Sequence, residues 1–130
     1  MDLHSSTPCR ASHPLDGRPG STTAALDHAR AFLRRCSPPV SGDTAGNLLL
    51  VVSELVTNAV RHAPGPCTLD LACNGRLEVA VSDTSSTVPV ARAPDLGGSG
   101  GFGWHVVNQV SRRVRVRLRP PYGKTVTATL

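Results

Sequence analysis

Three polar side chains recur at four-residue spacing inside an otherwise apolar segment, SELVTNAVRH, residues 53–62. On a helix, Glu54, Asn58 and His62 share one narrow stripe, and Arg61 lies beside them. A carboxylate next to an amide oxygen offers the hard oxygen ligands that Mg²⁺ prefers, and the carboxylate can also accept a proton from an attacking hydroxyl. We interpret the stripe as a candidate site for such chemistry. An ordinary solvated helix face is the alternative.

A second carboxylate, Asp83, is predicted to face the core. It is in phase with the apolar positions of residues 77–81, which alternate with polar ones as in a half-buried strand. An inward-facing carboxylate needs a hydrogen-bond donor, and the amino group of a ligand bound between sheet and helices would supply one. The alternative is that the strand has already ended and Asp83 starts a turn with Thr84 and Ser85.

Glycines gather just before an apolar helical segment that starts at Trp104. They are Gly97, Gly98, Gly100, Gly101 and Gly103. Their backbone N–H groups can converge on an anion, and the start of the helix adds favourable partial charge. A glycine cluster alone is more often a linker, but its position between a strand and a helix favours a phosphate-binding loop. The aperiodic stretch after Asp83, about 20 residues long, is expected to be a lid or binding loop.

Two amphipathic helices are predicted to precede the strands. The first begins at Ser21, a plausible N-cap, and its apolar residues recur at helical spacing as far as Cys36, after which a proline pair ends it. The second is capped by Asp43 and extends to about Ala63, where the sequence APGP stops it. The polar stripe therefore lies in the C-terminal half of the second helix.

Four segments after the helices alternate with period two and are predicted to be strands. They are residues 68–73, 77–83, 113–119 and 125–130, and Asn74-Gly75 marks a hairpin between the first two. Helices grouped before and between such strands predict an α+β fold: a two-layer sandwich with a mixed, mostly antiparallel sheet and the helices on one face. Residues 1–20 are rich in Pro, Ser and Gly, and are expected to form a flexible tail or a short edge strand. Residues 21–130 form the predicted domain.

Composition limits the classes of function. The 130 residues suffice for one core, and the formal net charge of +5 is compatible with nucleic acid, phosphate ligands or an acidic protein. An aromatic content of 3% leaves little for base stacking, and the arginines at 113–119 are better explained as a solvated sheet face than as a nucleic-acid site. The four cysteines lack metal-ligand spacing and suggest a reducing cytosol. No apolar run approaches membrane-spanning length, so we expect a cytoplasmic protein.

The order of these features resembles the Bergerat-fold (GHKL) ATPase superfamily, and within it the actinobacterial anti-sigma-factor serine/threonine kinases, with their histidine-kinase-like ATPase domain. SELVTNAVRHA resembles the N box, EVAVSD the first glycine box, GGFGWHVV the second and GKTVTATL the last. The resemblance covers roughly residues 20 to 130.

The resemblance implies catalytic and magnesium-binding roles for the helical stripe. Glu54 would be the base that activates a hydroxyl of a protein substrate. Asn58 would hold the Mg²⁺ that bridges the triphosphate, and Arg61 and His62 would lie near the phosphates.

The resemblance also implies contacts to the rest of ATP. Asp83 would bind the adenine amino group, and Thr125 would add hydroxyl or water contacts to the base. Gly101 and Gly103 would form the hinge of an ATP lid.

The implied function is that of an anti-sigma factor that binds ATP with Mg²⁺. It would sequester a sigma factor and phosphorylate a Ser or Thr of a STAS-type anti-anti-sigma antagonist. Arg30 and Arg34, on the polar face of the first helix, are candidate partner contacts, and related proteins imply a possible homodimer through the sheet. One alternative is a non-catalytic sigma-binding module, because Asp-Thr-Ser-Ser-Thr at 83–87 replaces the usual Asp-x-Gly-x-Gly. A detached sensor-kinase domain is less favoured, because no phosphoacceptor segment precedes residue 21.

Overall fold

A five-stranded sheet in the order β1-β2-β3-β5-β4 forms one layer of the protein, and all four strand pairings are antiparallel. The computed structural model describes residues 9–63, 65–86 and 101–130, with the side chains of 101 and 102 outside the description. The elements are β1 (Cys9–Leu15), α1 (Ser21–Arg34), α2 (Gly42–His62), β2 (Cys67–Cys73), β3 (Leu77–Asp83), α3 (Gly101–Val110), β4 (Arg113–Leu118) and β5 (Lys124–Thr129). The predicted α+β class is confirmed.

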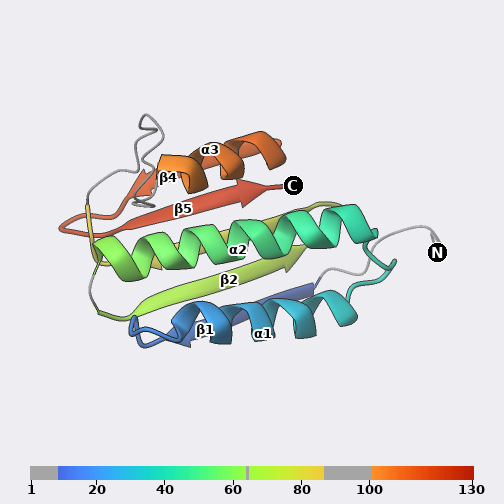
Figure 1. The fold of residues 1–130 in the computed structure, drawn as a ribbon, viewed down its shortest axis with the longest axis horizontal. Coiled ribbons are helices and arrows are strands. Elements are labelled where there is room, and N and C mark those ends of the chain that lie inside the picture. Colours follow the sequence, from blue (N-terminus) through green and yellow to red (C-terminus); the bar gives the residue numbers. More distant parts are fainter. Residues whose placement is uncertain (1–8, 64, 87–100) are drawn as a thin grey trace.

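The helices form the second layer and cover one face of the sheet (Figure 1). α1 packs on β1 and β2, α2 on β2 and β3, and α3 on α2 and β4. α2 and β3 both run toward the same end of the molecule, so the C-terminal turns of α2 come close to the end of β3. Residues from distant parts of the sequence therefore meet at this end.

The core lies between α2 and the central strands. Every second residue of β2 and β3 is buried, as the period-two pattern predicts. The apolar face of α2 packs against them with six buried residues: Leu48, Val51, Val52, Leu55, Val56 and Ala59. Each leucine or valine side chain among them contributes about 1.5–3 kcal/mol when fully buried. This packing fixes α2 on the sheet, and the direction of its polar stripe follows from it.

Both predicted helix caps differ from the structure. The N-cap of α1 is Gly20, at a φ of 105°, and not Ser21. The Ser21 hydroxyl instead donates to Asp16 Oδ1 at 3.0 Å, so it ties the helix start to the preceding loop. The N-cap of α2 is Ser41, whose side chain accepts a hydrogen bond from Thr44 N at 3.3 Å. Asp43 lies in the first turn of α2, where its negative charge interacts favourably with the helix dipole.

The remaining predicted boundaries are close to those observed. The sequence predicted either a flexible tail or a short edge strand for residues 1–20. β1 lies in this segment and pairs with β2 along its whole length. Gly75 takes a φ of 76° in the β2–β3 hairpin, as a tight Asn-Gly turn requires. Among the described residues, no helix has both the length and the apolar character needed to cross a bilayer.

Candidate functional site

The polar stripe of α2 faces away from the sheet. Glu54 and Asn58 are half-buried, whereas Arg61 and His62 are exposed in the last turn. α3 packs against α2 and begins at the same end of the molecule at which α2 ends (Figure 1). The stripe therefore borders the start of α3, and the N-terminus of a helix favours negative charge.

Gly103 of α3 lies directly against the Glu54 carboxylate. A Cβ built on Gly103 would overlap Glu54 Oε2 and lie 2.8 Å from Glu54 Cδ. The glycine is therefore needed for close approach between α3 and the carboxylate. The helix itself begins at Gly101, three residues before the predicted start at Trp104, so Gly101 and Gly103 lie within its first turn. Gly97, Gly98 and Gly100 fall outside the described residues.

We predict that Gly103→Ala displaces the Glu54 carboxylate while the fold is retained. The atom in the way is the far end of a flexible side chain, so the carboxylate can swing away at little cost. The free energy of unfolding should change by less than about 1 kcal/mol, as measured by urea denaturation. Gly46→Ala, on an open face of α2, is the control and should stabilise slightly. If a structure of Gly103→Ala showed Glu54 unmoved, the proposed contact would be wrong.

Asp83 faces the core, and a protein side chain supplies its hydrogen-bond donor. Lys124 Nζ lies 3.1 Å from Asp83 Oδ1 and 2.9 Å from Oδ2, and both residues are buried, with 2% of Lys124 and 8% of Asp83 exposed. The two are direct register partners across β3 and β5. The two sequence interpretations of Asp83 both hold in part, because β3 ends at Asp83 while its side chain still points inward.

Hydroxyl residues build the turn that follows Asp83. Ser85 N donates to Asp83 Oδ1 at 2.9 Å, and Ser86 Oγ accepts from Gly123 N at 3.1 Å. Gly123, at a φ of 102°, lets β5 approach this turn, since a Cβ there would lie 2.7 Å from the Asp83 carbonyl oxygen. Ser85 thus closes the turn on Asp83, and Ser86 ties it to the start of β5, without the glycines of the usual motif.

The Asp83 carboxylate keeps one acceptor position. A carboxylate offers about four lone-pair sites. Among the described residues, Oδ1 accepts from Lys124 and Ser85, and Oδ2 accepts from Lys124. By this count one lone-pair site of Oδ2 is unused among the described residues, at a position where only 8% of Asp83 is exposed.

Thr125 is not brought to Asp83. The Thr125 hydroxyl lies 2.8 Å from the hydroxyl of Ser82, its register partner. Each of these two residues is the direct sequence neighbour of a member of the inward-facing Asp83–Lys124 pair, so both face the opposite side of the sheet. The inward position at the start of β5 belongs to Lys124, in phase with the buried Val126 and Ala128. Thr125 is thus not beside Asp83 in this structure, and its contact with the base of a nucleotide stays a prediction.

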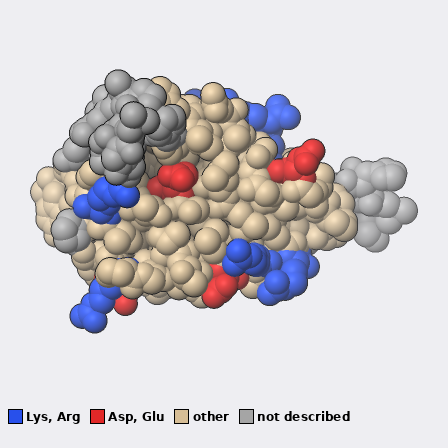
Figure 2. All heavy atoms as spheres, in the orientation of Figure 1, with Lys and Arg blue, Asp and Glu red and all other residues tan. Residues whose placement is uncertain are grey.

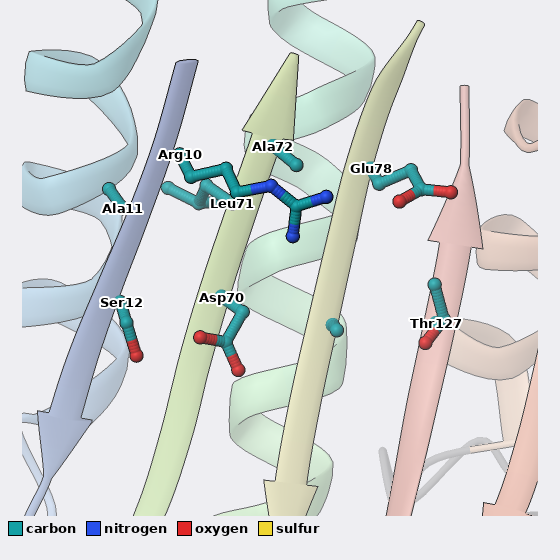
Figure 3. A pocket seen from close by; sticks show the side chains of 9 residues that line it. Arg10, Ala11, Ser12, Asp70, Leu71, Ala72, Glu78 and Thr127 are labelled. Carbon is teal, nitrogen blue, oxygen red and sulfur yellow. The ribbon is translucent and has the colours of Figure 1, made fainter. Parts of the chain in front are cut away.

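The open face of the sheet is polar and lies away from this site. One groove of about 440 Å³ is crossed by the Arg10 side chain, with Asp70, Glu78 and Thr127 around it (Figure 3). A second groove of about 470 Å³ is lined by the four arginines from Arg113 to Arg119 and by threonines of β5. The helix-covered face carries only scattered charges among its described residues (Figure 2).

The remaining predicted contacts lie on α1. Arg30 and Arg34 are both exposed. Arg30 forms a weak surface pair with Asp27, with Nη1 3.4 Å from Oδ1.

Among the described residues, no group of three or more His, Cys, Asp or Glu side chains is arranged to hold a metal ion. A Mg²⁺ here would need ligands beyond these side chains, such as amide oxygens, water or phosphate.

Comparison with known proteins gives a family and a fold. Residues 16–130 match the family described as histidine kinase-like ATPase domain. No curated protein matches the chain. Among solved structures, the RsbU and RsbW domains of Rv1364c from Mycobacterium tuberculosis match with a TM-score of 0.64 at 18% identity. The match covers 95% of this chain and 32% of that one, so this chain spans about a third of its length.

Proposed function

Because this chain belongs to the histidine kinase-like ATPase domain family, we propose that it is an anti-sigma factor that binds ATP with Mg²⁺. It sequesters a sigma factor and phosphorylates a Ser or Thr of a STAS-type anti-anti-sigma antagonist. The observation that carries the proposal is the meeting of Glu54 with Gly103 at the start of α3, at the end of the molecule where β3 brings in Asp83. We propose a cytoplasmic location and a possible homodimer through the open sheet face.

The residues at this end fit a nucleotide. The free acceptor position on Asp83 Oδ2 suits the N–H of an adenine amino group. Half-buried Asn58 and Glu54 offer oxygen atoms to Mg²⁺, and the first turn of α3 offers backbone N–H groups to phosphate. Arg61 and His62 add donors where the helix reaches solvent. ATP would supply the phosphoryl group that is transferred.

In the proposed mechanism, positioning and charge neutralisation are the main tasks of the protein. Glu54 accepts the proton of the attacking hydroxyl, and Gly103 holds the carboxylate in place by its close approach. The Asn58 side-chain oxygen would hold Mg²⁺, which would neutralise phosphate charge, and Arg61 would add positive charge near the phosphates. The phosphate then added to the antagonist repels the contact surface and releases it, which frees the protein to bind its sigma factor.

A phosphorylation assay tests the proposal. The protein is incubated with γ-labelled ATP, Mg²⁺ and the STAS-type antagonists encoded in the same genome. The proposal expects label on a Ser or Thr of one antagonist. If sigma binding occurs but no antagonist is labelled, the protein is a non-catalytic sigma-binding module. This function is favoured by Lys124, whose ammonium group already donates to both carboxylate oxygens of Asp83 and to the Ser85 carbonyl oxygen.

We predict that α1 carries part of the sigma-binding surface. Arg30→Glu with Arg34→Glu should weaken sigma binding at least about 10-fold, because exposed acidic groups of the partner would meet like charges. Titration calorimetry measures the affinity. Arg113→Glu with Arg117→Glu, on the other face of the sheet, makes the same charge change and is the control. Equal affinities for both double variants and the wild type would move the interface away from α1.

A further inference from the structure

Three of the four free cysteines meet at the end of the molecule opposite the candidate site. Cys9 begins β1, Cys73 ends β2, and Cys36 follows the last turn of α1. Figure 1 shows the start of β1, the tip of β2 and the end of α1 at one end of the molecule, and the start of α3 and the end of β3 at the other. The proposed ATP chemistry uses none of these thiols.

Cys9 and Cys73 are direct register partners across β1 and β2. Opposed residues of an antiparallel pair have Cα atoms about 4.5–5.5 Å apart and side chains on the same face. Disulfides span Cα separations of about 4.4–6.8 Å. The register thus places the two Cα atoms within the range that a disulfide can span.

The three thiols differ in access. Cys36 and Cys73 are 7% and 8% exposed, whereas Cys9 is only half-buried. Arg35 Nη2 donates to Cys9 Sγ at 3.4 Å from the end of α1. Burial, followed by the neighbouring Cys73 thiol, raises the pKa of Cys36 to about 11, so this residue stays protonated at neutral pH. A small oxidant in solution therefore meets Cys9 first.

We propose that Cys9 and Cys73 form a site of reversible oxidation, at which hydrogen peroxide closes a disulfide between β1 and β2. The Cys9 sulfur attacks one peroxide oxygen, so an S–O bond forms, the O–O bond breaks and water leaves. The Cys73 sulfur then attacks this sulfenic sulfur, the S–S bond forms and the hydroxyl leaves as a second water. Two thiols are oxidised to one disulfide and one peroxide is reduced to two waters. A dithiol reverses the reaction. This inference does not depend on the proposed function.

Tryptic mapping without reductant tests the site in the full chain. Cleavage after Arg10, Arg35, Arg61 and Arg76 separates Cys9 in residues 1–10, Cys36 in residues 36–61 and Cys73 in residues 62–76. After treatment with equimolar hydrogen peroxide, mass spectrometry should find residues 1–10 joined to residues 62–76. The oxidised protein should melt roughly 10 °C higher, since the bond closes a long loop.

Matched variants identify the sulfurs. Cys67 shares the 62–76 peptide but is buried and lies opposite Leu15, so Cys67→Ser should leave the cross-link unchanged. Cys9→Ser should abolish it. In Cys73→Ala, Cys9 should instead be trapped by dimedone as its sulfenic acid. The proposal is overturned if folded wild-type protein keeps all thiols reduced, if residues 36–61 replace residues 1–10 in the cross-link, or if Cys9→Ser still forms it.

Discussion

Replacing Glu54 with glutamine is expected to lower phosphoryl transfer to the antagonist by ~10²–10⁴-fold, while ATP and sigma binding persist. Glutamine keeps the size and much of the hydrogen bonding of the side chain but cannot accept the proton of the attacking hydroxyl. Because Glu54 is half-buried against Gly103, bulk water is a poor substitute for it as the acceptor of this proton. Single-turnover transfer with labelled ATP measures the effect directly.

Asn58→Ala separates binding from proton transfer on the same stripe. Asn58 lies one turn after Glu54, and its replacement would remove a magnesium ligand and not the base. Mg²⁺-dependent ATP affinity and phosphoryl transfer should therefore fall together. A structural stripe would give no such split. Transfer by Glu54→Gln at the wild-type single-turnover rate would show that Glu54 is not the base.

Lys124→Met is expected to destabilise the fold by about 3–5 kcal/mol, because it leaves the buried Asp83 carboxylate without its cation. Methionine fills a similar volume, so the loss reports the unpaired charge and not a cavity. With 2% of Lys124 exposed, water cannot replace the ammonium without opening the sheet end. Urea unfolding measures the change in the free energy of unfolding.

A double variant shows whether the loss comes from the ion pair. Asp83→Leu with Lys124→Met removes both charges and should regain most of the stability, since apolar pairs often replace buried ion pairs without cost. The two single losses should therefore be strongly non-additive. A Lys124→Met loss below about 1 kcal/mol, or a double variant as unstable as the sum, would contradict a tight buried pair.

The period of the apolar residues was sufficient to predict the helices, the strands after them and the α+β class. It identified the inward face of β3, because Asp83 continues the phase of Val79 and Val81. It did not locate the helix caps, since Ser21 and Asp43 have the side chains of caps but are used for a loop contact and a first-turn charge. The preference of a residue type for the N-cap cannot distinguish positions one or two residues apart when several neighbouring residues are suitable caps.

The site was predicted less completely, because it depends on pairing between distant strands. The same period-two argument that turned Asp83 inward also turns Lys124 inward, ahead of Val126 and Ala128. Only the β3–β5 register, however, places the lysine opposite the aspartate. The Cys9–Cys73 pair likewise needs the β1–β2 register, which the sequence left open with the strand itself.

We propose that this end of the molecule binds ATP through the Asp83 carboxylate. Comparing ATP with inosine triphosphate tests it most directly, since the two differ at the position where adenine carries its amino group. Titration calorimetry with Mg²⁺ should show ATP binding roughly 10–100-fold more tightly, the value of one hydrogen bond to a charged group. At a hundredfold excess over its Kd, ATP should stabilise the fold by ~2.7 kcal/mol, and Asp83→Asn should lose most of this gain. Equal affinity for both nucleotides, or an unchanged melt at millimolar ATP, would contradict the claim.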